Sequence, residues 1–312
     1  MVIMLKAPAP LKHSIEYLLF RLVCGAMNAL PASFAIRVGR RIGLVSARFL
    51  KTRTNLAYSN LELAFGDGLS HQERIKIIRD LFGYLGEVFV ESIIFAPKDV
   101  HENITIENLE WVNDALQLNK GVIIIAPHFG PWELGSYALG AHITDAATIY
   151  KPLKNRYINN YIVRAREKIV HLELISSKNA LRPVLGKLRQ GNAVVILFDQ
   201  NAGKKGIPST FFGKKAMTYS TPAALALQTG CPVIHAHIQN DGELRRFRII
   251  FGKPFPLVDT GNREQDLLAN TQQYNDYLEN LVRSDPARWF GWLHNRWKIP
   301  GRVSENKAAP RP

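Results

Sequence analysis

A histidine and a glutamate five positions apart are the residues of this sequence best suited to acid–base chemistry. They lie in residues 126–135, which read APHFGPWELG. The segment follows a short apolar run, Gly130 permits an unusual turn, and Pro131 suits the first position of a helix. His128 would therefore leave the tip of a strand, and Glu133 would fall in the first turn of the next helix. We expect the two side chains to lie close together.

This pair has the composition of a catalytic dyad without a nucleophile of its own. A carboxylate at Glu133 can accept the Nδ1 proton of His128, which leaves Nε2 as a base facing the cleft above the carboxyl ends of the strands. The sequence has no GxSxG elbow and no cysteine in this turn, so covalent catalysis has no obvious candidate. A substrate hydroxyl, deprotonated by His128, would then attack an activated acyl group. Spacing alone also allows a helix-capping histidine and a glutamate that complements the helix dipole.

Strands and helices alternate around this turn. Short apolar runs occur at residues 122–126, 147–150, 172–175, 193–198 and 233–238, and helical patterns occupy 155–169, 179–190 and 220–228. The alternation predicts an α/β fold with a largely parallel central sheet flanked by helices. We expect an antiparallel strand at 247–251 and a closing amphipathic helix at 264–282. Upstream, Ser70 and Glu73 have capping-box spacing, which predicts a helix that runs to Phe95.

Four segments together resemble the bacterial late acyltransferases of lipid A biosynthesis. They are HFGPWE at 128–133, the basic helix with Arg164 and Arg166, the segment that begins VVILFDQNAGKKG at residue 194, and PARWFGWLHNRWK at 286–298. The resemblance implies a glycerolipid acyltransferase-like α/β domain. It also implies transfer of a fatty acyl chain from an acyl carrier protein thioester to a hydroxyl of a lipid A precursor. The family's histidine is a general base and its acidic residue orients it, which implies these roles for His128 and Glu133, with no covalent acyl-enzyme.

The resemblance further implies substrate-binding residues. Arg164 and Arg166 match a basic pair that is suited to bidentate hydrogen bonds with a sugar phosphate. Because residues two apart do not share a helix face, we expect at most one of them to point into the cleft. Asp199 and Gln200 follow a predicted strand and match an acidic position near the family's active site. The thioester is already activated, so the resemblance implies no metal or redox cofactor.

Basic charge is concentrated at the amino end. Residues 1–56 contain nine lysines and arginines against a single acid, Glu16. The apolar stretch at 17–30 is interrupted by Arg21 and is shorter than the roughly 20 residues that cross a bilayer. We expect a helical membrane-associating segment whose apolar side chains enter the acyl boundary while its basic side chains meet lipid phosphates. The alternative is an amphipathic helix packed against its own domain.

These patterns predict a division of the chain. Residues 1–55 would associate with the cytoplasmic face of the inner membrane, 56–300 would form the acyltransferase domain, and 301–312 would be a flexible tail. Near the carboxyl end, tryptophans alternate with basic residues, as they do at bilayer interfaces, although a packed terminal helix explains them equally well. The tryptophans are Trp289, Trp292 and Trp297.

Composition narrows the class of protein. With 46% hydrophobic and 21% charged residues among 312, the chain can form a large core, which excludes a disordered chain or a multi-span channel. Its two cysteines are not at metal-ligand spacing, so no cysteine-based metal site is expected. The net charge of +14 favours an acidic partner. Because no nucleic-acid module is recognisable, we expect acyl carrier protein, a membrane lipid acceptor and the anionic inner-membrane surface as partners, and no nucleic acid.

Two other functions remain open at the level of the sequence. The same dyad could activate water, which would make the protein a thioesterase. The acceptor could also be another anionic glycolipid or membrane lipid, since arginine binds a phosphoinositol head group as well as a phosphorylated glucosamine disaccharide.

Overall fold

The computed structural model describes residues 9–169 and 172–298, so the expected tail at 301–312 lies outside the described residues. The helices are α1 (Ala9–Ala29), α2 (Ala32–Phe49), α3 (Lys51–Phe65), α4 (His71–Ile94), α5 (Pro97–Asn103), α6 (Glu110–Gln117), α7 (Trp132–His142), α8 (Arg156–Ile169), α9 (Leu181–Arg189), α10 (Thr221–Thr229) and α11 (Arg263–Ser284). The strands are β1 (Ile104–Glu107), β2 (Val122–Ala126), β3 (Ala147–Tyr150), β4 (Glu173–Ser176), β5 (Ala193–Leu197), β6 (Ile207–Phe211), β7 (Lys214–Thr218), β8 (Val233–Asn240) and β9 (Phe247–Phe251).

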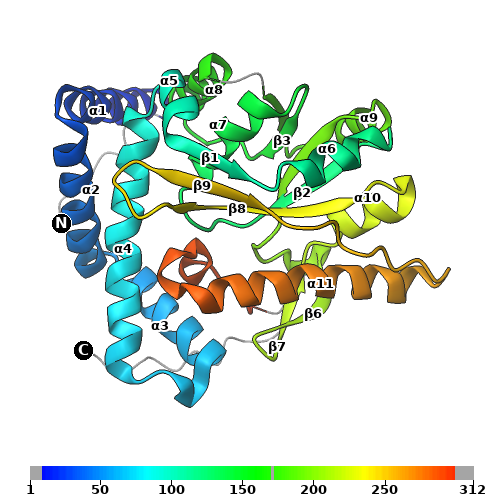
Figure 1. The fold of residues 1–312 in the computed structure, drawn as a ribbon. Coiled ribbons are helices and arrows are strands. Elements are labelled where there is room, and N and C mark those ends of the chain that lie inside the picture. The colour runs from blue at the N-terminus through cyan, green and yellow to red at the C-terminus, as the bar shows by residue number, and fades with distance from the viewer. Residues whose placement is uncertain (1–8, 170–171, 299–312) are drawn as a thin grey trace.

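A seven-stranded sheet in the order β1-β9-β8-β2-β5-β3-β4 forms the centre of the molecule (Figure 1). β2 pairs in parallel with β5 and β8, and β3 joins β5 to β4, again in parallel. β9 runs antiparallel to β8, and β1 pairs with β9. The predicted α/β class and the antiparallel strand at 247–251 are confirmed. The sequence patterns did not predict β1 or the separate β6–β7 hairpin.

Helices cover both faces of the sheet, which explains the unbroken apolar runs in its strands. Residues 122–125 of β2 are fully buried, because Ile123 and Ile125 face α9, α10 and α11 while Val122 and Ile124 face α6 and α7. Figure 1 shows α1, α2 and α4 at one end of the molecule and α6, α9 and α10 at the other. The predicted capping box is also present, since Ser70 and Glu73 exchange hydrogen bonds at the start of α4.

The amino-terminal helices pack on the rest of the chain through one side only. Glycines allow the backbones of α2 and α4 to contact each other directly. A Cβ at Gly39, Gly43 or Gly86 would overlap the opposite helix. α1 lies against α8, where Asn155 donates to the carbonyl of His13 and to the Glu16 carboxylate. Within the described residues, no helix is both long and apolar enough to span a bilayer.

The outer side of these helices is apolar and basic. Exposed apolar side chains on α1 are Leu11, Ile15, Leu18, Leu19, Leu22 and Val23, and those on α2 are Phe34, Ile42, Val45 and Phe49. Spacings of three and four residues place most of them in one stripe on each helix. Arg37, Arg41 and Arg48 are exposed on α2. The helix pair therefore combines packing on its own domain with an amphipathic outer surface.

Candidate active site

His128 and Asp199 come from the ends of two adjacent parallel strands. Ala126 at the end of β2 pairs with Leu197 at the end of β5, and each functional residue lies two positions further along its chain. His128 Nδ1 is 2.7 Å from Asp199 Oδ1, and the backbone N–H of His128 donates to Asp199 Oδ2 at 3.0 Å. Asp199 is fully buried, and the His128 side chain is 15% exposed. Through these two hydrogen bonds the carboxylate fixes both the ring and the backbone of the histidine.

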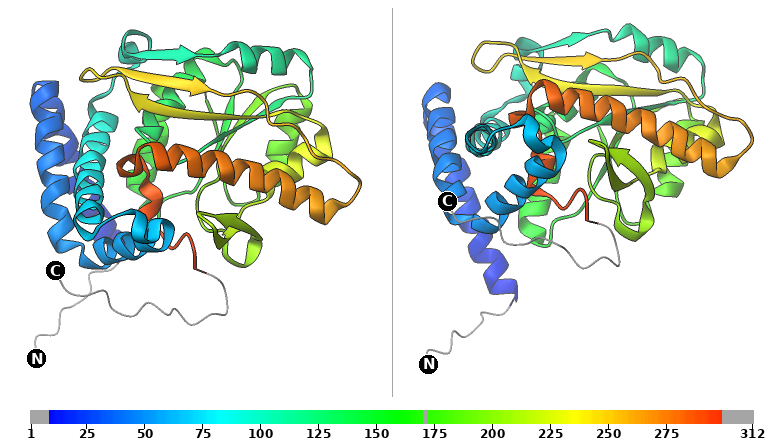
Figure 2. Two further views of the ribbon diagram at one scale, coloured as in Figure 1. Left: turned by 60° about the horizontal axis from the view of Figure 1, so that its bottom comes forward. Right: turned by 90° about the horizontal axis from the view of Figure 1, so that it is seen from below.

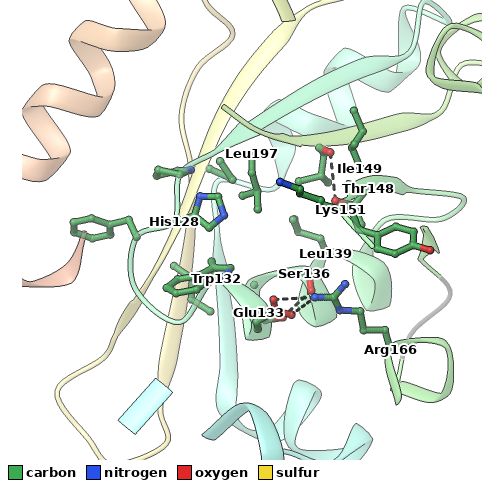
Figure 3. A pocket seen from close by; sticks show the side chains of 18 of the residues that line it. His128, Trp132, Glu133, Ser136, Leu139, Thr148, Ile149, Lys151, Arg166 and Leu197 are labelled. Carbon is green, nitrogen blue, oxygen red and sulfur yellow. Dashed lines mark hydrogen bonds and ion pairs between the residues drawn. The ribbon is translucent and has the colours of Figure 1, made fainter. Parts of the chain in front are cut away.

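The expected hydrogen bond from His128 to Glu133 is not formed. Glu133 instead accepts two hydrogen bonds from Arg166 Nη2, at 2.8 and 2.6 Å. In Figure 3 dashed lines join Glu133 to Arg166, and the His128 ring lies apart from them. The prediction relied on closeness along the chain, whereas α7 directs Glu133 toward α8 and the neighbouring strand supplies the partner of His128. Asp199, expected to bind substrate, therefore contacts the histidine.

A short segment near the carboxyl end holds the turn that carries His128. Phe290 donates its backbone N–H to the His128 carbonyl at 2.9 Å, and Gly130 donates to the Arg288 carbonyl at 3.1 Å. Gly130 has a φ of 65°, and a Cβ there would overlap the Ile238 carbonyl, so only glycine fits. Figure 2 shows this segment after α11, beside α3 and α4.

The tryptophans of this segment are buried, as the packing alternative predicts, but the segment forms short 3-10 turns and not the expected helix. Trp289 and Trp292 are fully buried and Trp297 is nearly so, in a cluster with Phe211 and Phe212. Trp289 Nε1 donates to Asp199 Oδ2 at 2.8 Å. The interfacial interpretation of these tryptophans is therefore wrong.

The histidine and the aspartate stabilise each other's charged forms. Burial opposes ionisation of Asp199, but the charge of His128 and the hydrogen bonds from His128 and Trp289 outweigh it, so the pKa of Asp199 lies below its ordinary value. Burial likewise lowers the pKa of His128, but Asp199, with a smaller contribution from Glu133, raises it above the ordinary value. An ionised Asp199 requires the proton of neutral His128 to sit on Nδ1, which leaves Nε2 as the basic atom.

His128 lines a largely apolar pocket of about 320 Å³ between the sheet, α7 and α8. Apolar side chains from both layers form most of its wall, among them Leu139, Ile162, Val163, Val195, Leu197 and Ile238. Polar groups lie at Glu133, Lys151 and Arg166 (Figure 3). A basic nitrogen beside an apolar pocket suits a reaction at the polar end of a hydrocarbon chain.

The remaining predicted residues are not brought together. Arg164 is exposed and is not part of the pocket, whereas Arg166, on the same helix, lines it. Gln200 is half-buried and also outside the pocket. Sequence reasoning missed the link between His128 and Asp199, although one signal was present: each residue follows a buried strand at the same offset. Nothing in the sequence indicated the hydrogen bond from Trp289.

Comparison of the sequence with known proteins shows its family. Residues 9–299 match the bacterial lipid A biosynthesis acyltransferase family. The chain is 27% identical over 274 residues to the lipid A biosynthesis palmitoleoyltransferase of Escherichia coli (strain K12), which covers 86% of each chain. It is 23% identical over 277 residues to the lipid A biosynthesis lauroyltransferase of the same organism, covering 86% of this chain and 87% of the relative.

A second group of relatives acts on a different lipid. The phosphatidylinositol mannoside acyltransferase of Mycolicibacterium smegmatis (strain ATCC 700084 / mc(2)155) is 22% identical over 200 residues, or 63% of each chain. Every relative named here is an acyltransferase, and the family match spans nearly the whole chain. This protein therefore belongs to the bacterial lipid A biosynthesis acyltransferase family.

Proposed function

We propose that this protein transfers a fatty acyl chain from an acyl carrier protein thioester to a hydroxyl group of a lipid A precursor. The observation that carries the proposal is the hydrogen bond of 2.7 Å between His128 and the buried Asp199, beside an apolar pocket. Membership of the lipid A acyltransferase family supports the lipid acceptor. The donor is proposed because a thioester is already activated for attack by a hydroxyl that His128 would deprotonate.

In the proposed mechanism His128 is the general base and Asp199 orients it. Nε2 removes the proton of the acceptor hydroxyl as its oxygen attacks the thioester carbonyl carbon. Asp199 stabilises the imidazolium that forms, because it accepts a hydrogen bond from Nδ1–H and stays ionised. When the tetrahedral intermediate collapses, the carbon–sulfur bond breaks and the imidazolium returns the proton to the leaving thiolate. The new ester bond then joins the acyl chain to the acceptor, and His128 is neutral again.

The pocket supports separate places for the two substrates. Its apolar wall between the sheet and α7 suits the hydrocarbon of the acyl chain, since burial stabilises an alkyl chain in proportion to its area. Arg166, held by Glu133, is the proposed contact for an anionic head group. Glu133 is thus a proposed positioning residue for the arginine, and it adds a smaller favourable charge to His128.

The proposed location is the cytoplasmic face of the inner membrane. Support comes from the exposed apolar stripes on α1 and α2 and from the exposed arginines that accompany them on α2. The net charge of +14 would favour encounter with both an anionic bilayer and an acidic carrier protein. The lipid acceptor would then reach His128 by lateral diffusion in the bilayer.

One assay tests the proposal and its alternatives. Purified protein receives an acyl carrier protein thioester with a lipid A precursor, with a phosphatidylinositol mannoside, or with water alone. We expect transfer to the first acceptor, and a loss of about 100- to 10,000-fold in His128→Ala. His101→Ala, at an exposed histidine outside the pocket, is the matched control. Preferential acylation of the mannoside, thioester hydrolysis that exceeds transfer, or normal turnover by His128→Ala would each overturn the proposal.

A further inference from the structure

Trp289 connects the carboxyl-terminal segment to the centre of the active site. It is fully buried, and its indole N–H donates to Asp199 Oδ2 at 2.8 Å. The other oxygen of that carboxylate accepts the Nδ1–H of His128 at 2.7 Å. The backbone on either side of Trp289 is tied to the same turn, through the Arg288 carbonyl and the Phe290 N–H. Three consecutive residues therefore hold the histidine and its carboxylate from one side.

We propose that Trp289 is a positioning residue, whose indole N–H holds the Asp199 carboxylate in the rotamer that presents Oδ1 to His128. The expected effect on kcat rests on the proposed function, whereas the effect on the His128–Asp199 hydrogen bond does not. A carboxylate at the end of a short side chain can rotate about its Cβ–Cγ bond, and the Trp289 N–H is the one side-chain donor other than His128 that fixes it within the described residues. An indole N–H is a donor only, so it favours the ionised carboxylate and cannot take the proton from it.

The remaining charged groups near the pair come from other elements. Glu133 acts on His128, His294 lies close enough to interact with the charge of His128, and Arg296 interacts with that of Asp199. None of them donates a hydrogen bond to the Asp199 carboxylate among the described residues. Substitutions at Trp289 remove none of these three charged groups, so they test the indole N–H without deleting another charge near the pair.

Two substitutions separate the hydrogen bond from the packing. Trp289→Phe keeps an aromatic ring but removes the donor. Trp289→Gln loses the ring but keeps an N–H four bonds from Cα, as in tryptophan, so it can reach Asp199. If Trp289 acts only through packing, Trp289→Phe should be more active than Trp289→Gln. If its N–H positions Asp199, Trp289→Gln should be the more active variant, although it packs less well. Trp292→Phe is the matched control, because Trp292 is equally buried and donates to the Pro286 carbonyl.

The kinetic result expected for Trp289→Phe is a fall in kcat of about 10- to 100-fold, the loss of one hydrogen bond to a charged group, with the KM of the thioester little changed. The acid limb of the pH profile should move to higher pH. A carboxylate that has lost a donor is more basic, holds the imidazolium more strongly, and so raises the pKa of His128 further. Trp289→Gln should restore part of both changes, and Trp292→Phe should show neither.

A second measurement does not depend on acyl transfer. The Nδ1 proton and the ring nitrogens of His128 are followed by NMR against pH in the full chain, with thermal unfolding as a check that each variant folds. We expect Trp289→Phe to shift the Nδ1 proton resonance and the titration midpoint, and Trp289→Gln to recover them. An unchanged His128 spectrum in Trp289→Phe, or a glutamine variant worse than the phenylalanine variant in kcat and in the titration, would overturn the inference. If the NMR changes occur while His128→Ala still transfers acyl groups normally, the proposed function fails and the positioning role stands.

Discussion

Two carboxylates interact with His128, and the interaction with Asp199 is stronger than that with Glu133. Asp199 is fully buried and accepts hydrogen bonds from the ring and the backbone of the histidine. Glu133 is partly exposed, is paired with Arg166, and influences the pKa of His128 only through its charge. A buried and hydrogen-bonded carboxylate interacts more strongly than a partly solvated one, because water screens the second. The histidine should therefore respond mainly to Asp199.

This difference predicts the pH dependence of the reaction. A general base must be neutral, so kcat/KM should rise with pH through the raised pKa of His128. Asp199→Asn removes the main charge that raises this pKa, so the acid limb should move to lower pH while kcat falls about 100-fold or more. Glu133→Gln should move the limb in the same direction by less. The pH profiles of the three proteins test the ranking, and a larger shift in Glu133→Gln would contradict it.

Arg166 and Arg164 form a matched pair for testing acceptor binding. Arg166 lines the pocket and Arg164, two residues earlier, is exposed outside it. We expect Arg166→Ala to lower kcat/KM for the lipid acceptor about 10- to 100-fold, the usual effect of losing a charge-assisted hydrogen bond. Hydrolysis of the thioester without acceptor should fall much less, and Arg164→Ala should resemble the unmodified protein in both assays. Equal losses of both activities in Arg166→Ala would indicate that the arginine only holds α8 against α7.

At the scale of elements, the strand runs were predictable and their order was not. The runs at 122–126 and 193–198 were located within one residue of β2 and β5, because a strand buried on both faces is apolar throughout. Their adjacency could not be predicted, since β3 and β4 lie between them in the chain but beyond β5 in the sheet. Thus His128 was predicted from its own turn, whereas its hydrogen bond to Asp199 depended on long-range strand order.

The short elements escaped prediction for a different reason. β1 has four residues, and the β6–β7 hairpin has only one well-buried face. Neither gives a long apolar run, and β1 completes the sheet only through its pairing with β9. The role of Trp289 was hidden in the same way, because indole burial depends on packing between segments that are far apart in sequence. Local patterns therefore predicted the elements that contain the site, but not the contacts that complete it.

A buried acid on α4 predicts an unusual pH dependence of stability. Glu91 is 2% exposed, its Oε2 has no hydrogen-bond partner among the described residues, and burial raises its pKa to about 8. The folded protein keeps this proton where the unfolded chain has lost it, so stability should fall as pH rises from about 4.5 to about 8.

Replacing this acid should remove the pH-dependent loss. Glu91→Gln is expected to stabilise the protein by a few kcal/mol near pH 8 and by little near pH 5, since each unit of pKa shift corresponds to about 1.4 kcal/mol. Thermal unfolding across this range measures the gain. Glu62→Gln, at a side chain that is 59% exposed, should give no such trend. A gain that does not grow with pH would mean that Glu91 ionises normally in the folded protein.

At the scale of the whole molecule, the amino-terminal helices face two environments. The inner side of α2 meets α4 through glycines, and the outer sides of α1 and α2 carry exposed apolar stripes. Deletion of residues 1–50 would uncover α4 as well as remove the stripes, so aggregation after deletion would not distinguish a membrane anchor from a structural support. Point substitutions on the outer side separate these roles.

The last prediction is that charge on the outer stripe of α1 releases the protein from membranes and leaves its fold intact. Leu18 and Leu22 are each 60% exposed on one helix face. Replacing both with glutamate removes two side chains that would be buried in the acyl boundary, each worth about 1.5 to 3 kcal/mol, and adds charges that an anionic surface repels. Sedimentation with vesicles that contain anionic phospholipid should show binding weakened at least 100-fold.

Activity in two environments completes this test. The double variant should acylate acceptor dispersed in detergent at the normal rate but use acceptor embedded in vesicles poorly, because only the second requires the enzyme to stay on the bilayer. Leu181→Glu is the control, since Leu181 on α9 is 59% exposed but lies at the start of a helix at the opposite end of the molecule (Figure 1). A double variant that still binds vesicles would locate the membrane contact elsewhere, whereas equal loss of activity in detergent would show that α1 instead supports α8 and the pocket wall.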